Sequence, residues 1–429
     1  METAIKAPRG TRDVLGDESW KWAHVLDVCR DVARDFGYSE VLLPIFEHTE
    51  LFCRGIGDAT DVVEKEMYTF IDKGDRSITL RPELTASMAR SYLEHDMRRA
   101  PQPVKLWSAG PMFRYERPQK GRYRQFWQTD FEILGVQDPM ADLETIDTSM
   151  EIYRRLGLTN LQVLINSVGC PKCRPAYRDA LKRFIESGPG GLEALCETCR
   201  GRFDRNPLRI LDCKKLACKE ITEGAPAILD SLCDECAAHF EDVTRGLERI
   251  GADARLDKRL VRGLDYYTKT AFEILAGELG SQNAVCGGGR YDNLAEAIGG
   301  PSVPGVGFAS GIERIVITLE GQGVFLGDKP HVDVYVVTAS NGLALEAAAL
   351  AHELRASGIA ADTDYAGRGM KAQMKQAAAS GAAFVCIIGE DEAASGTVSV
   401  KNMSDGEQRS IARNEAASKL ALWREERNR

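Results

Sequence analysis

The strongest chemical signal in the sequence is a short basic segment at residues 114–124, which reads RYERPQKGRYR. It carries five basic residues and one acid in a chain whose net charge is −9. Guanidinium groups match the geometry of phosphate oxygens, so several of them on one hairpin predict a site for a polyphosphate or a nucleic-acid backbone. The competing interpretation is a solvated hairpin. Gln128 and Glu132 follow on the same predicted strand among apolar residues, which favours the phosphate site.

Two glycine-rich segments offer further candidates for binding a substrate. GVGFAS at 305–310 nearly matches a dinucleotide fingerprint, but Ser310 occupies the third glycine position and no βαβ unit with a ribose-binding acid follows. GGGRYD at 287–292 lacks the Lys-Ser/Thr of a P-loop and is predicted to form a turn before a short helix. Its glycines would let a substrate approach the backbone. Arg314, at the start of a predicted helix, would reach a terminal phosphate. Each segment is equally compatible with a simple tight turn.

The segment RGLDYY at 262–267 places a charge and two phenols on one predicted strand. Because side chains alternate along a strand, Tyr266 and Tyr267 would share one half of a pocket only if the strand bends. A tyrosine on such a strand usually belongs to the core. Arg262 is different, because a guanidinium on a buried strand needs an anionic partner.

Eight of the twelve cysteines form four close pairs within 67 residues. The pairs are Cys170/Cys173, Cys196/Cys199, Cys213/Cys218 and Cys233/Cys236. The polar start of the sequence does not resemble a secretion signal, so we expect a reducing compartment and not a disulfide framework. The spacing suits thiolate ligands of one or even two tetrahedral sites, and we predict a structural zinc ion among them. The alternative is a set of reduced cysteines that only pack.

Several functions have no support in the sequence. The six histidines lie outside all of these segments, and there is no H-E-x-x-H metal helix and no G-x-S-x-G elbow, so a hydrolase with a catalytic zinc or a nucleophilic triad is not predicted. The net charge argues against non-specific coating of nucleic acid but permits a local basic site. The longest apolar run, residues 382–388, is too short to cross a bilayer, so we expect a cytoplasmic protein without a membrane partner.

The elements that position these residues are predicted to form three regions. A helix is expected over about 20–36 and a strand over 39–47, and alternating runs between 78 and 136 predict a mostly antiparallel sheet. Cysteine pairs and helical stretches interrupt the sheet. After a linker, strands alternate with helices, as in a small α/β domain. We predict a catalytic domain over 1–325, interrupted by a cysteine-rich insertion over 171–250, and a C-terminal domain over 331–429; a chain of 429 residues has room for them.

Taken in order, these segments resemble those of the histidyl-tRNA synthetases, a family of class II aminoacyl-tRNA synthetases. The similar segments are APRGTRDVL at 7–15, TLRPELTA at 79–86, FRYERPQKGRYRQF at 113–126, LVRGLDYYTKT at 260–270, CGGGRYDNL at 286–294 and GVGFASGIERI at 305–315. GMKAQMKQA, GAAFVCIIGE and GTVSVKN resemble the anticodon-binding domain of the family. RGLDYY and GGGRYD are specific to the histidine enzymes within the class.

The resemblance implies an α+β catalytic domain of the class II type on a mostly antiparallel sheet, a helical cysteine-rich insertion and a C-terminal α/β anticodon-binding domain. It implies ATP-dependent activation of L-histidine to histidyl-adenylate and transfer to the 3′ end of tRNA(His), by a homodimer whose interface includes the strand through Pro44. Mg²⁺ would accompany the phosphates of ATP. Because the carboxylate of the substrate is the nucleophile, the protein aligns groups and stabilises charge, and no histidine base is needed.

The resemblance also implies roles for individual residues. Histidine would contact Glu83, Thr85, Gln128, Glu132, Tyr266 and Tyr267, with Glu132 and Tyr267 at the imidazole nitrogens. Arg114, Arg262 and Arg314 would be catalytic, and ATP would contact Arg114, Glu116, Arg122 and Arg314. The acceptor end of tRNA would contact Gln119, Lys120 and Arg124, and its anticodon would contact Arg368, Lys371 and Lys375.

One residue departs from the family pattern, and other functions compete with the enzyme. Trp127 stands where the family usually has a histidine, but it should point away from Gln128 on an alternating strand, so we expect altered packing and intact activity. The main alternative is a histidine-sensing regulatory subunit of an ATP phosphoribosyltransferase. Such subunits generally lack the C-terminal domain, whereas this chain keeps it together with Glu83 and Arg262. A cysteine-rich nucleic-acid-binding module without catalysis is a second alternative.

Overall fold

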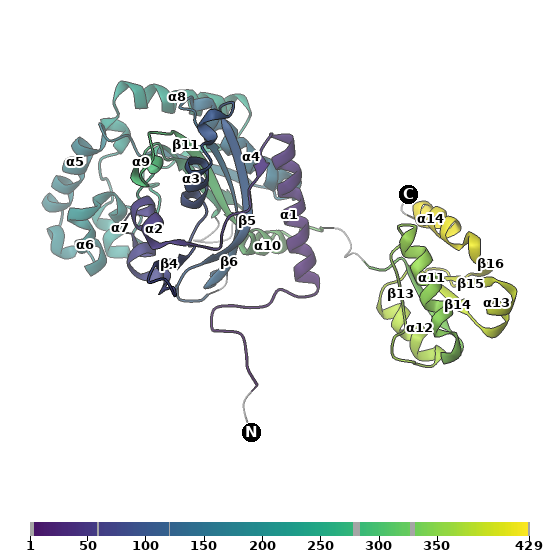
Figure 1. Cartoon of the computed structure of the whole chain (residues 1–429). Coiled ribbons are helices and arrows are strands. Elements are labelled where there is room, and N and C mark those ends of the chain that lie inside the picture. Colours follow the sequence, from purple (N-terminus) through teal and green to yellow (C-terminus); the bar gives the residue numbers. More distant parts are fainter. Residues whose placement is uncertain (1–3, 58–59, 120, 278–283, 327–330, 428–429) are drawn as a thin grey trace. The chain divides into compact units, whose positions relative to one another are not determined.

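The computed structural model describes residues 4–57, 60–119, 121–277, 284–326 and 331–427 (Figure 1). The chain divides into two compact units, residues 1–326 and 327–429. No helix within the described ranges is both long and apolar enough to cross a membrane.

The first unit is built on an eight-stranded sheet with the order β1-β5-β6-β11-β10-β9-β7-β8. All neighbouring strands are antiparallel except for the pairs β1–β5 and β7–β8. This confirms the predicted mostly antiparallel sheet. The strands are β1 Ser39–Glu40, β5 Val104–Phe113, β6 Gln125–Leu134, β11 Gly305–Gly311, β10 Ala284–Arg290, β9 Thr268–Ala276, β7 Leu161–Ser167 and β8 Ala254–Leu256.

One face of this sheet is covered by helices and forms the largest core of the protein (Figure 1). On β6, Phe131 and Ile133 point into this core together with side chains from neighbouring strands. Trp22, Val25 and Cys29 follow the spacing of a helix face and pack against them. The helices that contribute to this core are α1 Asp17–Asp35, α4 Pro139–Arg155, α8 Asp234–Arg249 and α10 Ile312–Gly321.

The alternating residues of β6, Gln128, Asp130 and Glu132, point to the opposite face, where polar groups lie among a second apolar cluster. That face is bordered by α3 and α9, and α2 packs against both. A three-stranded sheet of order β2-β4-β3 adjoins α2. These elements are α2 Thr49–Ile56, α3 Thr85–Glu94, α9 Leu294–Ala297, β2 Phe46–His48, β3 Tyr68–Ile71 and β4 Ser77–Leu80, with a short helix η1 Val62–Glu66 and a turn η2 Met97–Arg99.

The strand predicted over 39–47 is wrong, because only its two ends are strands. Residues 41–45, including Pro44, form an irregular link between β1 and β2. The buried guanidinium of Arg81 donates to the carbonyl oxygens of Leu43 (2.9 Å) and Pro44 (3.1 Å). Carbonyls that a side chain satisfies in this way do not need a strand ladder.

The segment between β7 and β8 is helical, as predicted, and has a small core of its own. Tyr177, Leu181 and Ile185 on α5 pack against Phe203 on α6. The helix α8 closes the segment and also packs on the core of the large sheet, so it joins the two. The elements are α5 Arg174–Ser187, η3 Gly191–Ala194, α6 Glu197–Arg205, η4 Pro207–Ile210, α7 Leu216–Ile221 and η5 Ile228–Ser231.

The second unit is a five-stranded mixed sheet of order β13-β12-β14-β15-β16 with helices. Its first three strands are parallel and its last two antiparallel, which confirms the predicted α/β pattern. The elements are β12 Val334–Thr338, η7 Asn341–Leu343, α11 Ala344–Ala356, β13 Ala361–Thr363, α12 Met370–Ala379, β14 Phe384–Ile388, α13 Glu390–Ser395, β15 Thr397–Asn402, β16 Gln408–Ala412, η8 Arg413–Glu415 and α14 Ala416–Arg427.

Candidate active site

A cavity of about 360 Å³ lies against the central strands of the large sheet, beside the starts of α3 and α10. It brings together ten of the residues that were predicted from the sequence to bind histidine or ATP or to be catalytic, although they come from well-separated segments. These residues are Glu83, Thr85, Arg114, Glu116, Arg122, Gln128, Arg262, Tyr266, Tyr267 and Arg314.

One wall of the cavity is the start of α3, where Glu83 is locked in place. Its carboxylate accepts hydrogen bonds from the backbone N–H groups of Thr85 (2.8 Å) and Ala86 (2.9 Å). These amides are otherwise unsatisfied at a helix start. Burial raises the pKa of Glu83, although these amide donors and Arg114 oppose the shift. A carboxylate held in this orientation suits a cationic amino group.

Glu132 lies behind the cavity wall, and its two oxygens already have partners. Oε1 accepts from the hydroxyl of Thr85 at 2.7 Å, and Oε2 accepts from the hydroxyl of Tyr291 at 2.5 Å. A Cβ at Gly307 on the adjacent strand would overlap Oε2, so glycine is needed for this contact. Burial raises the pKa of Glu132 to about 8, despite these donors. Tyr291 and Thr85 line the cavity, whereas Glu132 orients them from below.

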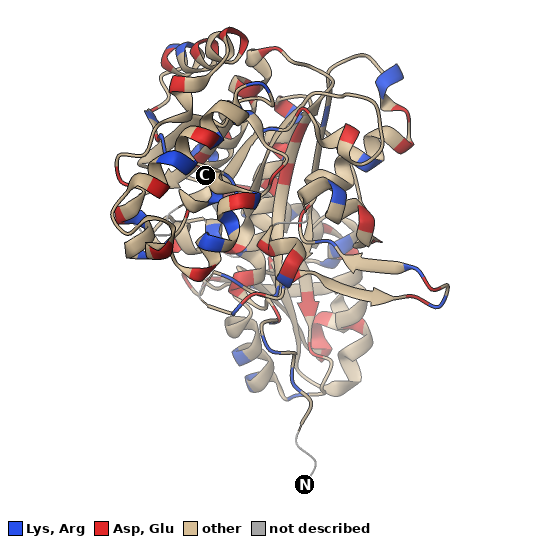
Figure 2. Ribbon diagram, turned by 90° about the vertical axis from the view of Figure 1, so that its left-hand side faces the viewer, with Lys and Arg blue, Asp and Glu red and all other residues tan. Residues whose placement is uncertain are grey.

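Asp130 is a cavity residue that the sequence reasoning missed. Its side chain is fully buried and lines the cavity, yet neither carboxylate oxygen has a hydrogen-bond partner among the described residues. Burial raises its pKa well above the ordinary value, and the nearby carboxylates of Glu132 and Glu83 raise it further. Figure 2 shows acidic residues on strands as well as on helices and loops. Strand alternation from Gln128 was the signal that could have found this residue.

The amide of Gln128 is also incompletely satisfied. Its Oε1 is buried and lacks a partner within the described ranges, although the side chain lines the cavity. Buried polar atoms without partners are uncommon in folded proteins and are typical of sites that a ligand completes. Gln128 and Asp130 therefore indicate a place for hydrogen-bond donors of a substrate.

Trp127 precedes Gln128 on β6, and its side chain lies on the opposite face of the sheet. Its ring packs edge-on against Trp22 of α1, with 6.0 Å between centroids. Its backbone N–H donates to the Glu313 carboxylate at 3.1 Å.

The two adjacent tyrosines lie together, because the strand predicted through them is wrong. β9 begins only at Thr268, and Tyr266 is part of a turn. The rings of Tyr266 and Tyr267 are 4.7 Å apart, and both line the cavity. Arg262, before the turn, lies over the ring of Tyr267 and pairs with Glu273 at 2.5 Å. The prediction that Arg262 needs an anionic partner is thus confirmed.

Three arginines form a positively charged end of the cavity. Arg114 donates through Nε to the carbonyl of Pro82 (2.9 Å), and Arg314 donates to the carbonyl of Ala284 (3.1 Å). Arg122 reaches Glu116 at 3.2 Å. Burial lowers the pKa of Arg314, and repulsion by Arg122 and Arg114 lowers it further. Within the described ranges these three guanidinium groups make one ion pair, with Glu116, and such an arrangement suits a polyphosphate.

The glycines at 287–289 are not in a turn, contrary to the prediction, but in strand β10. Gly287 lies under the guanidinium of Arg262, and a Cβ there would overlap it. The group that closely approaches the backbone of Gly287 is therefore Arg262, an arginine of the protein itself. The predicted helix start at Arg314 is confirmed, since α10 begins two residues earlier.

Comparison with known proteins identifies the family. Residues 10–315 match the family Histidyl-tRNA synthetase, and residues 333–422 match the family Anticodon binding domain. The chain belongs to the histidyl-tRNA synthetase family. It is 52% identical over 405 residues to the histidine–tRNA ligase of Desulforamulus reducens, covering 94% of this chain and 96% of that protein. The corresponding ligase of Pelotomaculum thermopropionicum is also 52% identical, over 404 residues, with 94% of each chain covered.

Solved structures agree with this assignment. The crystal structure of apo Staphylococcus aureus histidyl-tRNA synthetase is 40% identical with a TM-score of 0.82 and covers 97% of this chain and 100% of its own. The predicted family is therefore confirmed. So is the predicted fold class, with cysteine clusters in the insertion and a C-terminal α/β anticodon-binding domain.

Gln119 and Arg124 of this synthetase-family chain, which were predicted to contact the acceptor end of tRNA, do not line the cavity. Arg124 stacks on Tyr115, with 3.9 Å from its guanidinium carbon to the ring centroid, and its backbone N–H donates to Gly10. Gln119 forms an isolated bridge with Arg122. Lys120 lies outside the described residues.

The second unit presents the other predicted tRNA contacts on and before α12. Lys371 and Lys375 are exposed and one helical turn apart, so they share one face. Arg368 pairs with Asp364 at 2.8 Å. Gln373, which stands between the two lysines in the sequence, is buried. Its Oε1 accepts from the backbone N–H of Thr338 at 2.9 Å, which fixes the helix to the sheet.

The eight cysteines of the insertion form two groups of four. We call Cys170, Cys173, Cys233 and Cys236 the first cluster, and Cys196, Cys199, Cys213 and Cys218 the second cluster. All sulfur atoms within a cluster lie within 4.8 Å of one another, so each cluster could bind a metal ion.

Proposed function

We propose that this protein is a histidine–tRNA ligase that activates L-histidine with ATP to histidyl-adenylate and transfers it to the 3′ end of tRNA(His). One observation carries the proposal. A single cavity joins a carboxylate-and-phenol end, which suits an amino acid with an imidazole side chain, to an arginine end, which suits a triphosphate. The test is ATP–pyrophosphate exchange with each of the twenty amino acids. Exchange that depends on histidine alone is expected, and equal exchange with another amino acid would refute the specificity.

Histidine would lie at the end built from α3, β6 and the tyrosines. Glu83 and Gln128 would accept from its α-ammonium group, with Thr85 beside them. Tyr267 and Tyr291 would present their hydroxyls to the imidazole, and Glu132, predicted from the sequence at an imidazole nitrogen, would act on the substrate through Tyr291. A buried polar site of this kind rejects apolar analogues, because they would leave its groups unpaired. Tyr266 packs beside Tyr267 and completes this wall.

Asp130 is our addition to the amino-acid site. Its carboxylate lies in the cavity wall, and both of its buried oxygens lack a hydrogen-bond partner among the described residues. A bound cation or N–H donor would compensate for its burial, and histidine offers both an ammonium group and an imidazole N–H.

ATP would lie at the arginine end. Arg114 and Arg262 would stabilise the charge that develops at the α-phosphate when the histidine carboxylate attacks, and Arg314 would hold the γ-phosphate. Arg122 and Glu116 would border the nucleotide. Mg²⁺ bound to ATP would neutralise part of the phosphate charge, and cavity carboxylates such as Glu273 are the hard oxygen donors that it prefers.

For tRNA, we propose that the loop 119–124 meets the acceptor end and that Arg368, Lys371 and Lys375 meet the anticodon, within an anticodon-binding domain over 331–429. We place the catalytic domain over 1–325, with the insertion over 171–250. We also propose a cytoplasmic homodimer. Leu42, Phe46 and Ile71 near the small sheet are 85%, 57% and 64% exposed, and a second copy of the chain would cover this apolar surface.

The competing function is a histidine-sensing regulatory subunit. The intact arginine end and the match of residues 333–422 to an anticodon-binding family both favour the ligase. A regulatory subunit would bind histidine but would neither exchange pyrophosphate nor charge tRNA, so aminoacylation of tRNA(His) separates the two functions.

A further inference from the structure

The sulfur separations in the two clusters fit tetrahedral metal ions. Cys170 Sγ lies 3.6 Å from Cys173 Sγ and 3.9 Å from Cys233 Sγ, and Cys196 Sγ lies 4.0 Å from Cys213 Sγ. Four thiolates at about 2.3 Å from one zinc ion are about 3.8 Å apart at tetrahedral angles. A disulfide needs about 2.05 Å, and all eight cysteines are free.

Main-chain amides already point at these sulfurs. The N–H groups of Lys172 and Cys233 donate to Cys170 Sγ (3.3 Å) and Cys173 Sγ (3.2 Å). The N–H of Cys196 donates to Cys218 Sγ (3.3 Å) in the second cluster. Such donors favour the thiolate and are typical of the surroundings of bound metals. Soft thiolates in a tetrahedral set select zinc over magnesium or calcium.

The first cluster lies directly behind the amino-acid end of the cavity. Val168, just before Cys170, donates to the carbonyl of Lys269 at 2.7 Å, and the Lys269 N–H donates to Gly169 at 3.0 Å. Arg174, just after Cys173, donates to the carbonyls of Val168 (3.1 Å) and Tyr267. Residues on both sides of the pair Cys170/Cys173 are thus hydrogen-bonded to the backbone of residues 267–269.

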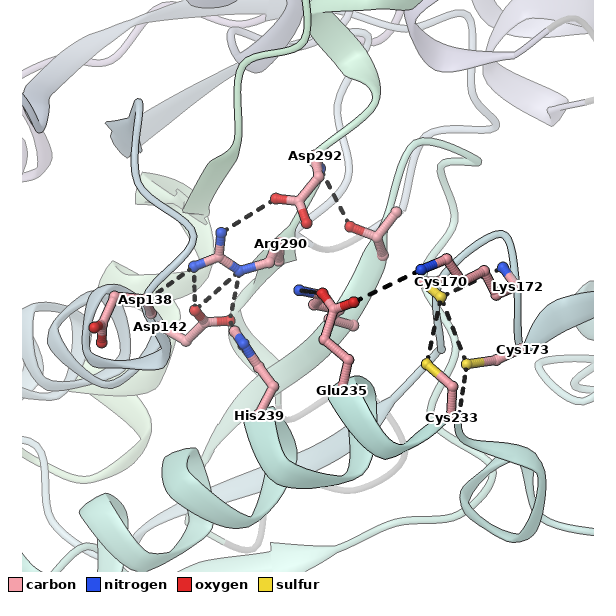
Figure 3. A network of polar contacts seen from close by, with 12 residues as sticks. Asp138, Asp142, Cys170, Lys172, Cys173, Cys233, Glu235, His239, Arg290 and Asp292 are labelled. Atoms are coloured by element: carbon pink, nitrogen blue, oxygen red, sulfur yellow. Dashed lines mark hydrogen bonds and ion pairs between the residues drawn. The ribbon is translucent and has the colours of Figure 1, made fainter.

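The helix α8, which supplies Cys236 and begins next to Cys233, makes a second connection (Figure 3). Glu235 binds the buried amine of Lys269 at 2.9 Å. One turn further on, His239 contacts Asp142 at 3.2 Å, and Asp142 holds the fully buried Arg290, the residue before Tyr291. Rotation or fraying of the first turn of α8 would therefore disturb the segments of both Tyr267 and Tyr291.

The second cluster fixes a different wall. On α6, Arg202 pairs with Asp61 at 2.5 Å, and Asn206 after it donates to Asp265 at 2.6 Å. Arg209, in the turn before Cys213, donates to the carbonyl of Gly263. These contacts reach Asp61, Gly263 and Asp265, whereas the segment of the first cluster binds the carbonyl of Tyr267 directly.

We propose that each cluster binds one Zn²⁺, giving two per chain, and that the first zinc is a positioning centre for the histidine end of the cavity. The zinc sites depend only on the geometry around the sulfur atoms, whereas the positioning role of the first zinc rests on the proposed function. Loss of the first zinc releases the segment 168–174 and the start of α8, and Tyr267 loses its fixed orientation.

Metal analysis tests the sites without any activity measurement. Full-length protein purified from zinc-supplemented cells without chelators is expected to hold two zinc per chain, with X-ray absorption showing four sulfur ligands per ion at about 2.3 Å. Cys233→Ser with Cys236→Ser should retain one zinc, and Cys213→Ser with Cys218→Ser should also retain one. Less than about 0.2 zinc in the wild type, a single zinc, iron in its place, or nitrogen or oxygen ligands would overturn the proposal.

A variant that keeps both ions tests the positioning role. Arg174→Gln should still hold two zinc, yet its KM for histidine in pyrophosphate exchange should rise about fivefold or more, because it loses the hydrogen bond that fixes Tyr267. Its KM for ATP should change less than twofold. Arg178→Gln, on the same helix but bonded only to Asp204 and Arg205 by the contacts described, is the matched control and should behave as wild type.

An unchanged histidine KM in Arg174→Gln, or equal increases for histidine and ATP, would overturn the positioning role. Failure of the proposed function looks different, because the wild type would then show no histidine-dependent exchange while its zinc content stayed at two.

Discussion

Replacing Asp130 with asparagine should weaken histidine binding and at the same time stabilise the ligand-free protein. The carboxylate is fully buried in the cavity wall and has no hydrogen-bond partner among the described residues. Its ionised form therefore destabilises the empty protein, and burial raises its pKa accordingly. Asparagine keeps the shape, removes the charge and retains one acceptor. When a ligand completes the hydrogen bonding of a buried residue, replacing that residue should change stability and ligand affinity in opposite directions.

The size of each effect follows from the contact that is lost. A hydrogen bond to a charged group contributes about 1.5–3 kcal/mol, so the KM for histidine should rise roughly 10- to 100-fold. The KM for ATP should stay within about twofold, because the arginine end keeps all of its contacts. Relief of the unpartnered carboxylate should raise the free energy of unfolding by about 1–3 kcal/mol at pH 8. The gain should shrink toward pH 4, where the folded-state carboxyl of the wild type is protonated.

The assay is ATP–pyrophosphate exchange with histidine and ATP varied in turn, together with denaturant unfolding at pH 5 and pH 8. Asp147→Asn is the matched control, since Asp147 is a half-buried carboxyl whose pKa is also raised by burial but which lies outside the cavity lining. It should leave both KM values unchanged. A more stable Asp130→Asn protein with an unchanged histidine KM would refute the assignment, because Asp130 would then be a structural residue only.

Further predictions concern the other groups. Tyr291→Phe removes the hydroxyl that donates to Glu132 and should raise the histidine KM roughly tenfold; an effect on the ATP KM alone would contradict the assigned end of the cavity. Because the folded-state pKa of Glu132 is raised to about 8, the stabilising contribution of its protonated form is complete below about pH 4 and is lost as pH rises to 8. In the Glu132→Gln variant the free energy of unfolding should therefore fall less steeply with pH over that window, by up to about 1.4 kcal/mol per pH unit. If denaturant melts of the variant give the same dependence on pH as the wild type, this carboxyl does not titrate there. Lys371→Ala with Lys375→Ala should reduce aminoacylation at low tRNA concentration but leave pyrophosphate exchange intact; equal loss of both would place these lysines elsewhere in the mechanism. Trp127→His should lower thermal stability through lost packing on Trp22 and leave exchange within about twofold, whereas a large gain in exchange would make Trp127 a determinant of activity.

The sequence predicted those features that depend on local periodicity. Two-residue alternation predicted that Trp127 points away from Gln128, and the sequence predicted a helix start at Arg314. Both are confirmed because neighbouring positions on one element decide them. The same alternation should have identified Asp130, which stands between Gln128 and Glu132 on the same face.

Features that depend on distant contacts were not predictable in this way. The glycines at 287–289 read as a turn, but they belong to strand β10, because Arg262 from another segment occupies the space that a side chain at Gly287 would need. The link around Pro44 is irregular because Arg81 satisfies its carbonyls. The cysteine spacings were equally compatible with several groupings, and only the packing of the insertion brings the outer pairs together and the inner pairs together.

Several charged groups of the cavity have no oppositely charged partner among the described residues, although Arg262 pairs with Glu273 and Arg122 with Glu116. Among the described residues, Arg114 and Arg314 donate to backbone carbonyls and to no carboxylate, and Asp130 accepts from no group. If these groups paired with one another, the free protein would be more stable but the cavity would close to substrates. Held apart, the arginines attract phosphate and the carboxylates attract an ammonium group at the other end. A substrate bound at both ends then has its own carboxylate between them, beside the α-phosphate, which is the alignment that adenylate formation requires.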